Sequence, residues 1–459
     1  MENYKEEIQS LRAIIDDLKL IVADLRKENE SLRKENELLR KEILYLKIGS
    51  NSRNSSMPPS TDIFKGLVQN PNRIKTGKAI GGQKGRDGNN LMFQTEIDKT
   101  QYHKKSHCDE CGHDLNQIGA TEGIKGQIID IPIIKPIVIE HISMVAICPH
   151  CSNKNKGQLP GTLDYCHVQY GARLKDLIVY LSVRNYLPVK RIAEFIQTAY
   201  GIKVSDGFII DCLTNKAEAV KEVYQEFLNQ IKQDTVVGSD ETGFKIKAEK
   251  AWMWLWRTQK HVYFKPSLKR DYKTIEEVMG AEIKHKFVLV TDRYPAQLKT
   301  NCMTHQVCLA HLIRECVNLN EKTGSAWVLK LKKIFKEIVK LSKPESIKIK
   351  ARDNIVKRLD QILNQALTKS HEKVKTLRVK LLKIKDYITT CLYYPDVPAE
   401  NNFCERSIRN VKLKLKVSTN LRSMQGAESY AIIRSIIDTS ILQGKNVWTA
   451  LQNPYILID

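Results

Sequence analysis

Residues 234 to 292 place their apolar side chains in the pattern that a β-sheet requires. The segments DTVVGSDETGFKI, AWMWLWRT and HVYFKP are rich in β-branched and aromatic residues and predict three consecutive strands of a meander. A helical pattern, YKTIEEVMG, follows them. The next segment, KFVLVTD, has the unbroken apolar run that is typical of a strand buried on both faces. The sequence therefore predicts a mixed α/β domain around this sheet.

Three acidic residues occupy notable places in this pattern. Asp240 lies in the first predicted strand, and Asp292 ends the last one, so adjacent strands would bring the two carboxylates together. Glu405 lies in PAENNFCERSIRNVK, where Pro398 precedes a predicted helix. Three carboxylates suit two magnesium ions, with manganese as the alternative, and such a pair of ions processes phosphodiesters in sites of the ribonuclease-H type. Glu241 is expected to point to the opposite face of its strand.

The chain resembles the acidic-triad (DDE) transposase domain of the insertion-sequence sixty-six family in five segments: GSDETGFK, VTDRYPAQ, CLAHLIREC, NNFCERSIRNVKLKLKVSTN and SMQGAESYAIIRSIIDTSILQGKNVWTAL. The resemblance covers nearly the full chain. It implies a ribonuclease-H-like catalytic core with the triad at Asp240, Asp292 and Glu405, and a large insertion between the second and third acids. The family commonly has an aromatic-rich turn after the third acid, where this chain has LKLKVSTN.

The implied activity is that of a DNA transposase. Metal-activated water would cut the element ends, and the freed 3′ hydroxyl would attack target DNA, with no covalent protein–DNA intermediate. Accessory transposition proteins are a further class of partner. Two alternatives stay open. One is a ribonuclease-H-fold nuclease or resolvase without strand transfer, and the other is a non-catalytic DNA-binding regulator.

Charge independently predicts a nucleic-acid partner. The formal net charge is +22 and the isoelectric point is about 9.4, values that attract phosphate backbones. Residues 321 to 385 carry 19 Lys or Arg against 6 Asp or Glu, in runs that predict amphipathic helices with a basic face. A merely solvated helical face is the alternative. Four basic residues that come after Glu405 in the sequence are predicted to bind nucleic acid: Arg406, Arg409, Lys412 and Lys414. For the two arginines, surface salt bridging is the alternative role.

A heptad repeat runs through the first 47 residues. One core position is Leu throughout: Leu11, Leu18, Leu25, Leu32, Leu39 and Leu46. The other is mostly β-branched, with two Asn residues: Ile8, Ile15, Val22, Asn29, Asn36 and Ile43. This pattern predicts a two-stranded parallel coiled coil whose Asn pairs fix register and strand number, and hence a homodimer. One long helix packed on its own domain is the alternative.

Two Cys-x-x-Cys pairs predict a metal site. Cys108 and Cys111 lie in HCDECGHDL, and Cys148 and Cys151 lie in ICPHC. Four thiolates in this pairing suit one tetrahedral structural zinc ion. The intervening KGQIIDIPIIKPIVIEHISMVA predicts strands, so the ion would hold the ends of a small β-ribbon. The neighbours that would replace one thiolate in an alternative ligand set are His107, His113 and His150.

The predicted fold class is multidomain α+β: a parallel coiled coil, a zinc ribbon, a helical DNA-binding region, and a ribonuclease-H-like α/β core with a helical insertion. Residues 166 to 232 are helical in period and predict either a helix-turn-helix or a helical brace. The predicted boundaries are 1–48 for the leucine zipper, 49–98 for a basic flexible linker, 99–165 for the zinc-binding domain, 166–232 for the helical region, 233–320 and 395–459 for the core, and 321–394 for the insertion.

Several further expectations follow from single residues and from composition. His311 in CLAHLIREC either approaches the metal site or is a hydrogen-bonded core histidine. The alternating Trp252, Trp254 and Trp256 are expected to pack rather than to stack on bases. The sequence has no signal peptide and no apolar run near 18 residues, so no membrane partner and a cytoplasmic location are expected. Its eleven Cys residues favour reduced thiols and metal sites over disulfides.

The heptad pattern gives the first testable prediction. Deletion of residues 1 to 47 should convert dimers to monomers in light scattering, because the Asn pairs and the charged flanks act between two chains. A truncated chain that stays dimeric would contradict the assignment of dimerisation to this helix.

Overall fold

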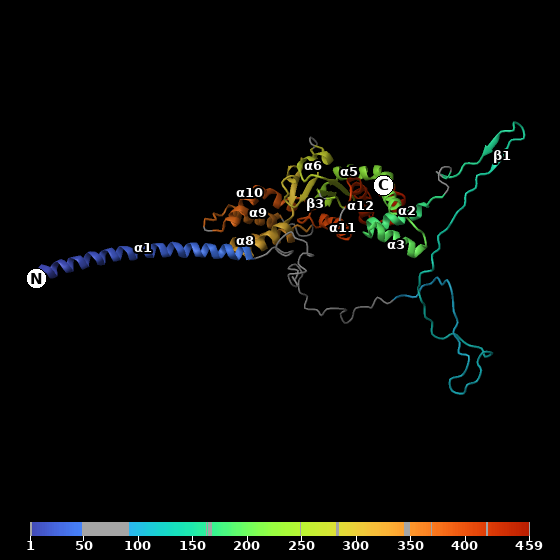
Figure 1. The fold of residues 1–459 in the computed structure, drawn as a ribbon, viewed down its shortest axis with the longest axis horizontal. Helices are drawn as coiled ribbons and strands as arrows, with labels where there is room; N and C mark the ends of the chain where they lie inside the picture. The colour runs from blue at the N-terminus through green and yellow to red at the C-terminus, as the bar shows by residue number, and fades with distance from the viewer. Residues whose placement is uncertain are drawn as a thin grey trace.

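The computed structural model describes residues 2–47, 91–161, 163, 168–247, 249–280, 284–343, 349–368, 370–418 and 421–458, with the backbone alone for 2–16 and 41–47 (Figure 1). Most of the predicted basic linker, residues 49 to 90, lies outside the described residues. Its last residues, 91 to 98, are exposed and carry no helix or strand. None of the described helices combines the length and the apolar character needed to span a membrane.

A five-stranded mixed sheet forms the centre of the molecule. The first three strands, β3, β4 and β5, form an antiparallel meander, as predicted. Strand β6 (Val288–Thr291) then pairs parallel to β3 (Val236–Ile246). A fifth strand, β7 (Thr304–Val307), was not predicted, because three of its four residues are polar. His305 and Gln306 are buried, and the side-chain amide of Gln306 donates to the carbonyl oxygens of Val307 and Ile388. The strand order is β5-β4-β3-β6-β7. The strands are β3 (Val236–Ile246), β4 (Glu249–Arg257), β5 (Val262–Ser267), β6 (Val288–Thr291) and β7 (Thr304–Val307).

Helices cover both faces of the sheet (Figure 1). Alternate side chains of β3 divide between two cores: Phe244 and Ile246 join the core that includes α11 (Asn402–Ser418) and α12 (Met424–Leu442). Val237 joins the opposite core, together with Trp254 and Trp256 and with α5 (Lys221–Gln233) and α6 (Tyr272–Met279). The predicted packing role of these two tryptophans is confirmed, since both are almost fully buried.

The edge strand β5 is capped by side chains of α12. The backbone amide of Phe264 donates to Ser435 Oγ, and that of Val262 donates to Thr439 Oγ1, both at 3.0 Å. A free strand edge is a template for unwanted pairing, and these hydroxyls satisfy amides that would otherwise be open.

The helical region before the sheet packs on the core. It comprises α2 (Ala172–Val179), the π-helix η2 (Tyr180–Arg184), α3 (Val189–Tyr200) and α4 (Asp206–Ala219). Helix α4 contacts both α2 and α12. These contacts use the face of Ile209, Cys212 and Ala217, and Ile210 on the outer face is 53% exposed, so the helical brace and the helix-turn-helix both stay predictions for α4.

A buried polar network joins this region to the core. The guanidinium of Arg434 on α12 is fully buried, pairs with Asp438 and donates to the carbonyl of Val183 on η2. Tyr186, whose φ of 63° is unusual for a residue other than glycine, donates its hydroxyl to Asn410 at 2.9 Å. Since each buried charge has a partner, separating the two parts would leave unpaired polar groups.

The predicted amphipathic helices of the insertion are confirmed. Helix α7 (Leu309–Thr323) leads into α8 (Ala326–Leu341), α9 (Ile349–Asn364) and α10 (Glu372–Leu382). Helix α8 packs between α7 and α9 on the apolar side chains of Leu331, Phe335 and Ile338. Its lysines lie on the outer, exposed face: Lys330, Lys333, Lys336 and Lys340.

The amino-terminal segment is one long helix, α1 (Glu2–Lys47). The leucines at the predicted seam remain 49 to 54% exposed in the single chain: Leu18, Leu25, Leu32 and Leu39. This open apolar seam suits the predicted second strand, and the dimer itself stays a prediction.

The prediction of strands between the two cysteine pairs is wrong for most of the segment. Residues 126 to 144 carry no strand, and Ile128, Ile133 and Val138 are more than 90% exposed. The last two residues of the predicted segment, Val145 and Ala146, do lie in a strand: β1 (Val145–Ile147) forms a short antiparallel hairpin with β2 (Lys154–Lys156). A β-branched run forms a strand only where a neighbouring strand and a covered face are available, and this segment has neither among the described residues.

The remaining short helices complete the chain. They are η3 (Gln297–Lys299), η5 (Lys385–Ile388), η6 (Thr390–Leu392), α13 (Val447–Gln452) and η7 (Pro454–Leu457).

The close approach of α11 to β3 depends on Gly238, which gives a second prediction. A Cβ at this position would lie 2.3 Å from Phe403 Cζ, so Gly238→Ala should force the helix away and lower the free energy of unfolding by about 1–3 kcal/mol. Denaturant unfolding measures this loss. Gly171→Ala is the control, because its added Cβ meets nothing within 4 Å; equal stability losses in the two variants would contradict the predicted contact.

Candidate active site

The parallel pairing of β3 with β6 brings two predicted site residues together. The register pairs Gly238 with Val290, and two residues further along each strand come Asp240 and Asp292. Their proximity also appears in their electrostatics. Burial raises the pKa of Asp240 well above its usual range, and the charges of Asp292, Glu241 and Glu405 raise it further. The predicted convergence of these two carboxylates is thus borne out by the strand register.

Glu405 comes from the first turn of α11, as predicted. Three contacts fix this end of the helix on the sheet. The side-chain amide of Asn401 donates to the backbone carbonyl of Ser239, the residue before Asp240, at 2.9 Å. Gly238 leaves room for Phe403, and the buried Arg257 on β4 donates to the carbonyl of Phe403 and to the hydroxyl of Ser407. The helix therefore presents its first-turn carboxylate toward the ends of β3 and β6.

The site has the character of a divalent-cation site. Asp292 Oδ1 and Asn401 Oδ1 are buried, and neither has a hydrogen-bond partner among the described residues. Such oxygens are costly to bury unless a donor or a cation satisfies them. Three mutually repelling carboxylates with an unsatisfied oxygen fit the oxygen-rich ligand set that a hard cation such as magnesium prefers.

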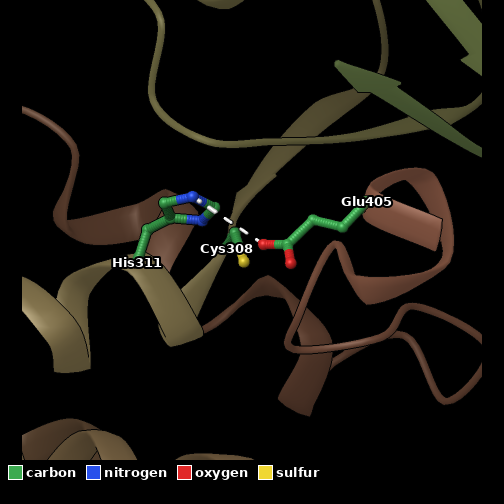
Figure 2. A group of neighbouring side chains, drawn as sticks. All are labelled: Cys308, His311 and Glu405. Atoms are coloured by element: carbon green, nitrogen blue, oxygen red, sulfur yellow. Dashed lines mark ion pairs between the residues drawn. The ribbon is translucent and has the colours of Figure 1, made fainter. Parts of the chain in front are cut away.

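Helix α7, which begins directly after β7, brings His311 toward Glu405 (Figure 2). Arg314 Nη2 donates to Glu405 Oε1 at 2.9 Å, and His311 Nε2 lies 3.8 Å from the same oxygen. One potential ligand atom each from Cys308, His311 and Glu405 lies within 4.8 Å of the other two. The structure therefore brings His311 to the site, the first of the two alternatives that the sequence left open. Burial, and next the Arg314 charge, lowers the pKa of His311.

Backbone contacts explain why α7 and α11 begin side by side. The backbone amide of Leu309 donates to the carbonyl of Ala399 at 2.9 Å, and the backbone amide of Asn401 donates to Cys308 Sγ at 3.1 Å. The Cys308 thiol is buried, and burial raises its pKa to about 12. Cys308 thus acts as a neutral hydrogen-bond acceptor that links the start of α7 to the segment before α11.

The turn after Asp292 is strained. Arg293 has a φ of 74°, in the left-handed region that non-glycine residues rarely adopt. Its guanidinium donates to Glu315 on α7 at 3.0 Å. Residues held in such conformations cluster at functional sites because the surrounding contacts must compensate for the strain. Sequence reasoning missed both this turn and the role of Arg314, and the only available signal was the density of charged residues in VTDRYPAQ and CLAHLIREC.

Glu241 follows Asp240 on β3, so its side chain is on the other face of the strand, but it is still close enough to Asp292 to interact with its charge. Its side chain is only 2% exposed and pairs with Arg270, whose guanidinium lies 4.1 Å from the ring centroid of Tyr294. Gln297 donates to its second oxygen at 2.6 Å. Burial, followed by the charge of Asp292, raises the pKa of Glu241 to about 7. Replacing Glu241 would break a buried ion pair, so it is unsuitable as a neutral control for the triad.

The four basic residues predicted to bind nucleic acid divide into two groups. Arg406, Arg409 and Lys412 are exposed on α11 in line with Glu405, and none of them takes part in an ion pair with another described residue. The prediction is wrong for Lys414. Its ammonium is buried and donates to the carbonyls of Ser182 and Leu187, because helical periodicity turns this position toward η2. Burial lowers the pKa of Lys414 to about 8.

The two cysteine pairs form matching turns. The amide of Cys108 donates to the carbonyl of His113, and the amide of Cys148 donates to that of Asn153. Hydrogen bonds from Cys111 and Cys151 contribute to lowering the pKa of Cys108 and Cys148, respectively. Among the described residues, however, no three of these thiols lie close enough to form one ligand group. Each pair is therefore preformed, and the joining of the two pairs stays a prediction.

Comparison with known proteins assigns the family. The transposase IS66 family model matches residues 167–429, more than half of the chain and the whole span of the three acids. This chain belongs to the IS66 transposase family. The zinc-finger binding domain of transposase IS66 matches residues 105–152, which include both cysteine pairs and support a structural zinc ion. A family of unknown function matches residues 5–92.

The chain is also similar to an uncharacterised protein, y4jD, of Sinorhizobium fredii. The two are 23% identical over 300 aligned residues, and the alignment covers 56% of this IS66-family chain and 57% of that protein. The similarity thus spans little more than half the length of that relative.

The cysteine pairs give a third prediction. Cys108→Ser or Cys148→Ser should reduce bound zinc from one ion per chain toward none and expose residues 100 to 165 to proteolysis, because structural zinc contributes folding free energy locally. Metal analysis and limited proteolysis measure the two effects. Cys302→Ser is the control, since its thiol donates to the carbonyl of Thr304, a bond that serine retains. One zinc ion retained in both test variants would rule out the four-thiolate site.

Proposed function

We propose that this protein is a DNA transposase whose catalytic residues are Asp240, Asp292 and Glu405. The observation that carries the proposal is the convergence of two half-buried acids, Asp240 on β3 and Asp292 directly after β6, with the helix-borne Glu405 inside the span of the IS66 transposase match. The charges of Asp292 and Glu405 raise the pKa of Asp240, so grouping the three acids is unfavourable for the protein alone. They suit the binding of divalent cations.

We further propose that the core is ribonuclease-H-like. This assignment is supported by the strand order β5-β4-β3-β6-β7, with three antiparallel strands followed by two parallel ones. The two acids lie on the two central strands that pair in parallel. Helix α11, which follows the insertion in the sequence, packs on β3 and carries the third acid.

Each residue has a definable task in this mechanism. Asp240 and Asp292 would hold the cations from the sheet, and Glu405 would hold them from the helix. Two bound magnesium ions supply the activation of the attacking oxygen and the stabilisation of the leaving one. Arg257 and Asn401 fix the helix that carries Glu405, so they act as positioning residues. The enzyme thereby contributes placement and electrostatics, and the nucleophile comes from water or from a DNA 3′ hydroxyl.

The DNA path is proposed to run along α11 and the insertion. Arg406, Arg409 and Lys412 form an exposed basic stripe that begins one residue after Glu405. The outer face of α8 adds its row of exposed lysines. Phosphate contacts of this kind bind DNA without reading its sequence and weaken as salt rises. A homodimer through α1 would bring two such catalytic domains to the two ends of one element.

The triad gives a fourth prediction. Asp240→Asn, Asp292→Asn or Glu405→Gln keeps the size of the side chain but removes a ligand charge, so cleavage and strand transfer on element-end DNA should fall by several orders of magnitude. DNA binding in a mobility-shift assay should persist, since the basic residues are unchanged. Glu277→Gln, at an exposed position of α6, is the matched control and should retain full activity.

The same assay separates the alternatives. Cleavage without joined products would favour a nuclease or resolvase. Unchanged DNA processing in Asp240→Asn would contradict the proposed triad, and DNA binding without any metal-dependent cleavage by the wild-type chain would favour a regulator.

A further inference from the structure

We propose that His311 is a direct ligand of the cation held by Glu405, which makes this position a mixed nitrogen and oxygen site that prefers a first-row transition ion such as Mn²⁺ to Mg²⁺. The inference rests on the proposed function, because it assigns a fourth protein ligand to the same metal site. The residue lies on α7, outside the carboxylate triad.

The imidazole of His311 has no ordinary hydrogen bond. Its Nδ1 is buried and has no partner among the described residues. Its Nε2 faces Glu405 Oε1 at 3.8 Å, which is too long for a hydrogen bond. The His311 side chain is 19% exposed, and its Nε2 has no hydrogen-bond partner among the described residues, so this nitrogen is available to a cation in the gap.

The width of the gap suits an ion. Two ligand atoms that are each about 2.1 Å from one ion lie about 3.0 Å apart at a right angle and about 4.2 Å apart when opposite. The separation of 3.8 Å between His311 Nε2 and Glu405 Oε1 falls between these limits. Figure 2 shows the ring and the carboxylate facing each other across this gap, with Cys308 behind it.

The surroundings hold both groups in place. Arg314 donates to Glu405 Oε1 and keeps the carboxylate beside the ring until a cation takes its place. The contacts of Leu309 and Asn401 lock the beginnings of α7 and α11 together, so the two ligands come from a rigid junction. A cation at Glu405 would replace Arg314 as the partner of that oxygen, because like charges repel at this distance.

The donor set determines which ion is preferred. Magnesium takes oxygen ligands in a strict octahedron, whereas transition ions accept imidazole nitrogen readily. Cys308 is unsuited as a third ligand, because its Sγ already accepts the amide of Asn401. The expected site is therefore one imidazole with carboxylates.

Electron spin-echo spectroscopy of Mn²⁺ added to the full-length protein tests this assignment directly. The wild-type spectrum should show ¹⁴N modulation from a coordinated imidazole, and His311→Ala should lose it. The affinity for Mn²⁺ should fall at least about tenfold, since even outer-shell partners of metal ligands are worth 10–100-fold in affinity. His311→Asp should keep a ligand and shift the preference toward Mg²⁺. His141→Ala, at an exposed histidine, is the control and should keep the modulation.

The outcomes are distinct. Mn²⁺ that binds and supports cleavage without ¹⁴N modulation would overturn this inference and leave the proposed function intact. Modulation that persists in His311→Ala, with the variant folded by circular dichroism, would place the nitrogen elsewhere and equally overturn it. A chain that binds no divalent cation at all would contradict both proposals.

Discussion

The repulsion among three half-buried carboxylates, Asp240 on β3, Asp292 directly after β6 and Glu405 on α11, is the constraint on which the rest of this structure depends. Burial and neighbouring acids raise the pKa of Asp240 well above its usual range, so the site is electrostatically unfavourable for the protein alone. The fold maintains it through packing elsewhere: the continuous cores on both sides of the sheet and the docking of α11 at Gly238. This combination of local cost and global support is expected of a functional site.

Positive groups around the acids divide into two kinds. Arg257 and Arg314 are anchored by hydrogen bonds to α11 and hold the third acid in position. The exposed basic residues Arg406, Arg409 and Lys412 of α11 form no ion pair with another described residue, which is why they are proposed to contact phosphate. Lys414 shows how sharply a helix makes this division, since its position two residues beyond Lys412 places the ammonium in the interior, bonded to backbone carbonyls. Charge counts along a sequence cannot separate these two roles, because a basic residue is assigned to one or the other by whether its side chain is buried or exposed.

Local patterns were reliable where the core enforces them. The three meander strands, α6, β6 and α11 all follow from apolar periodicity, and each has a covered face. The pattern failed in two opposite ways. Strand β7 has polar residues that are satisfied by partners distant in sequence, so no local signal announces it. Residues 126 to 144 carry a strong β pattern but lack a neighbour to pair with, so no strand forms.

The sequence by itself predicted the meander strands, β6, α11, the cysteine pairs and the amphipathic insertion, because each depends on the spacing of nearby residues. Only the tertiary structure decided which distant groups meet. The contact of Arg314 and His311 with Glu405 joins residues about 90 positions apart, and it exists because the starts of α7 and α11 are hydrogen-bonded to each other. The burial of Lys414 likewise depends on η2, more than 200 residues earlier. Such contacts arise from packing between elements, and the periodicity of one element carries no information about its partner.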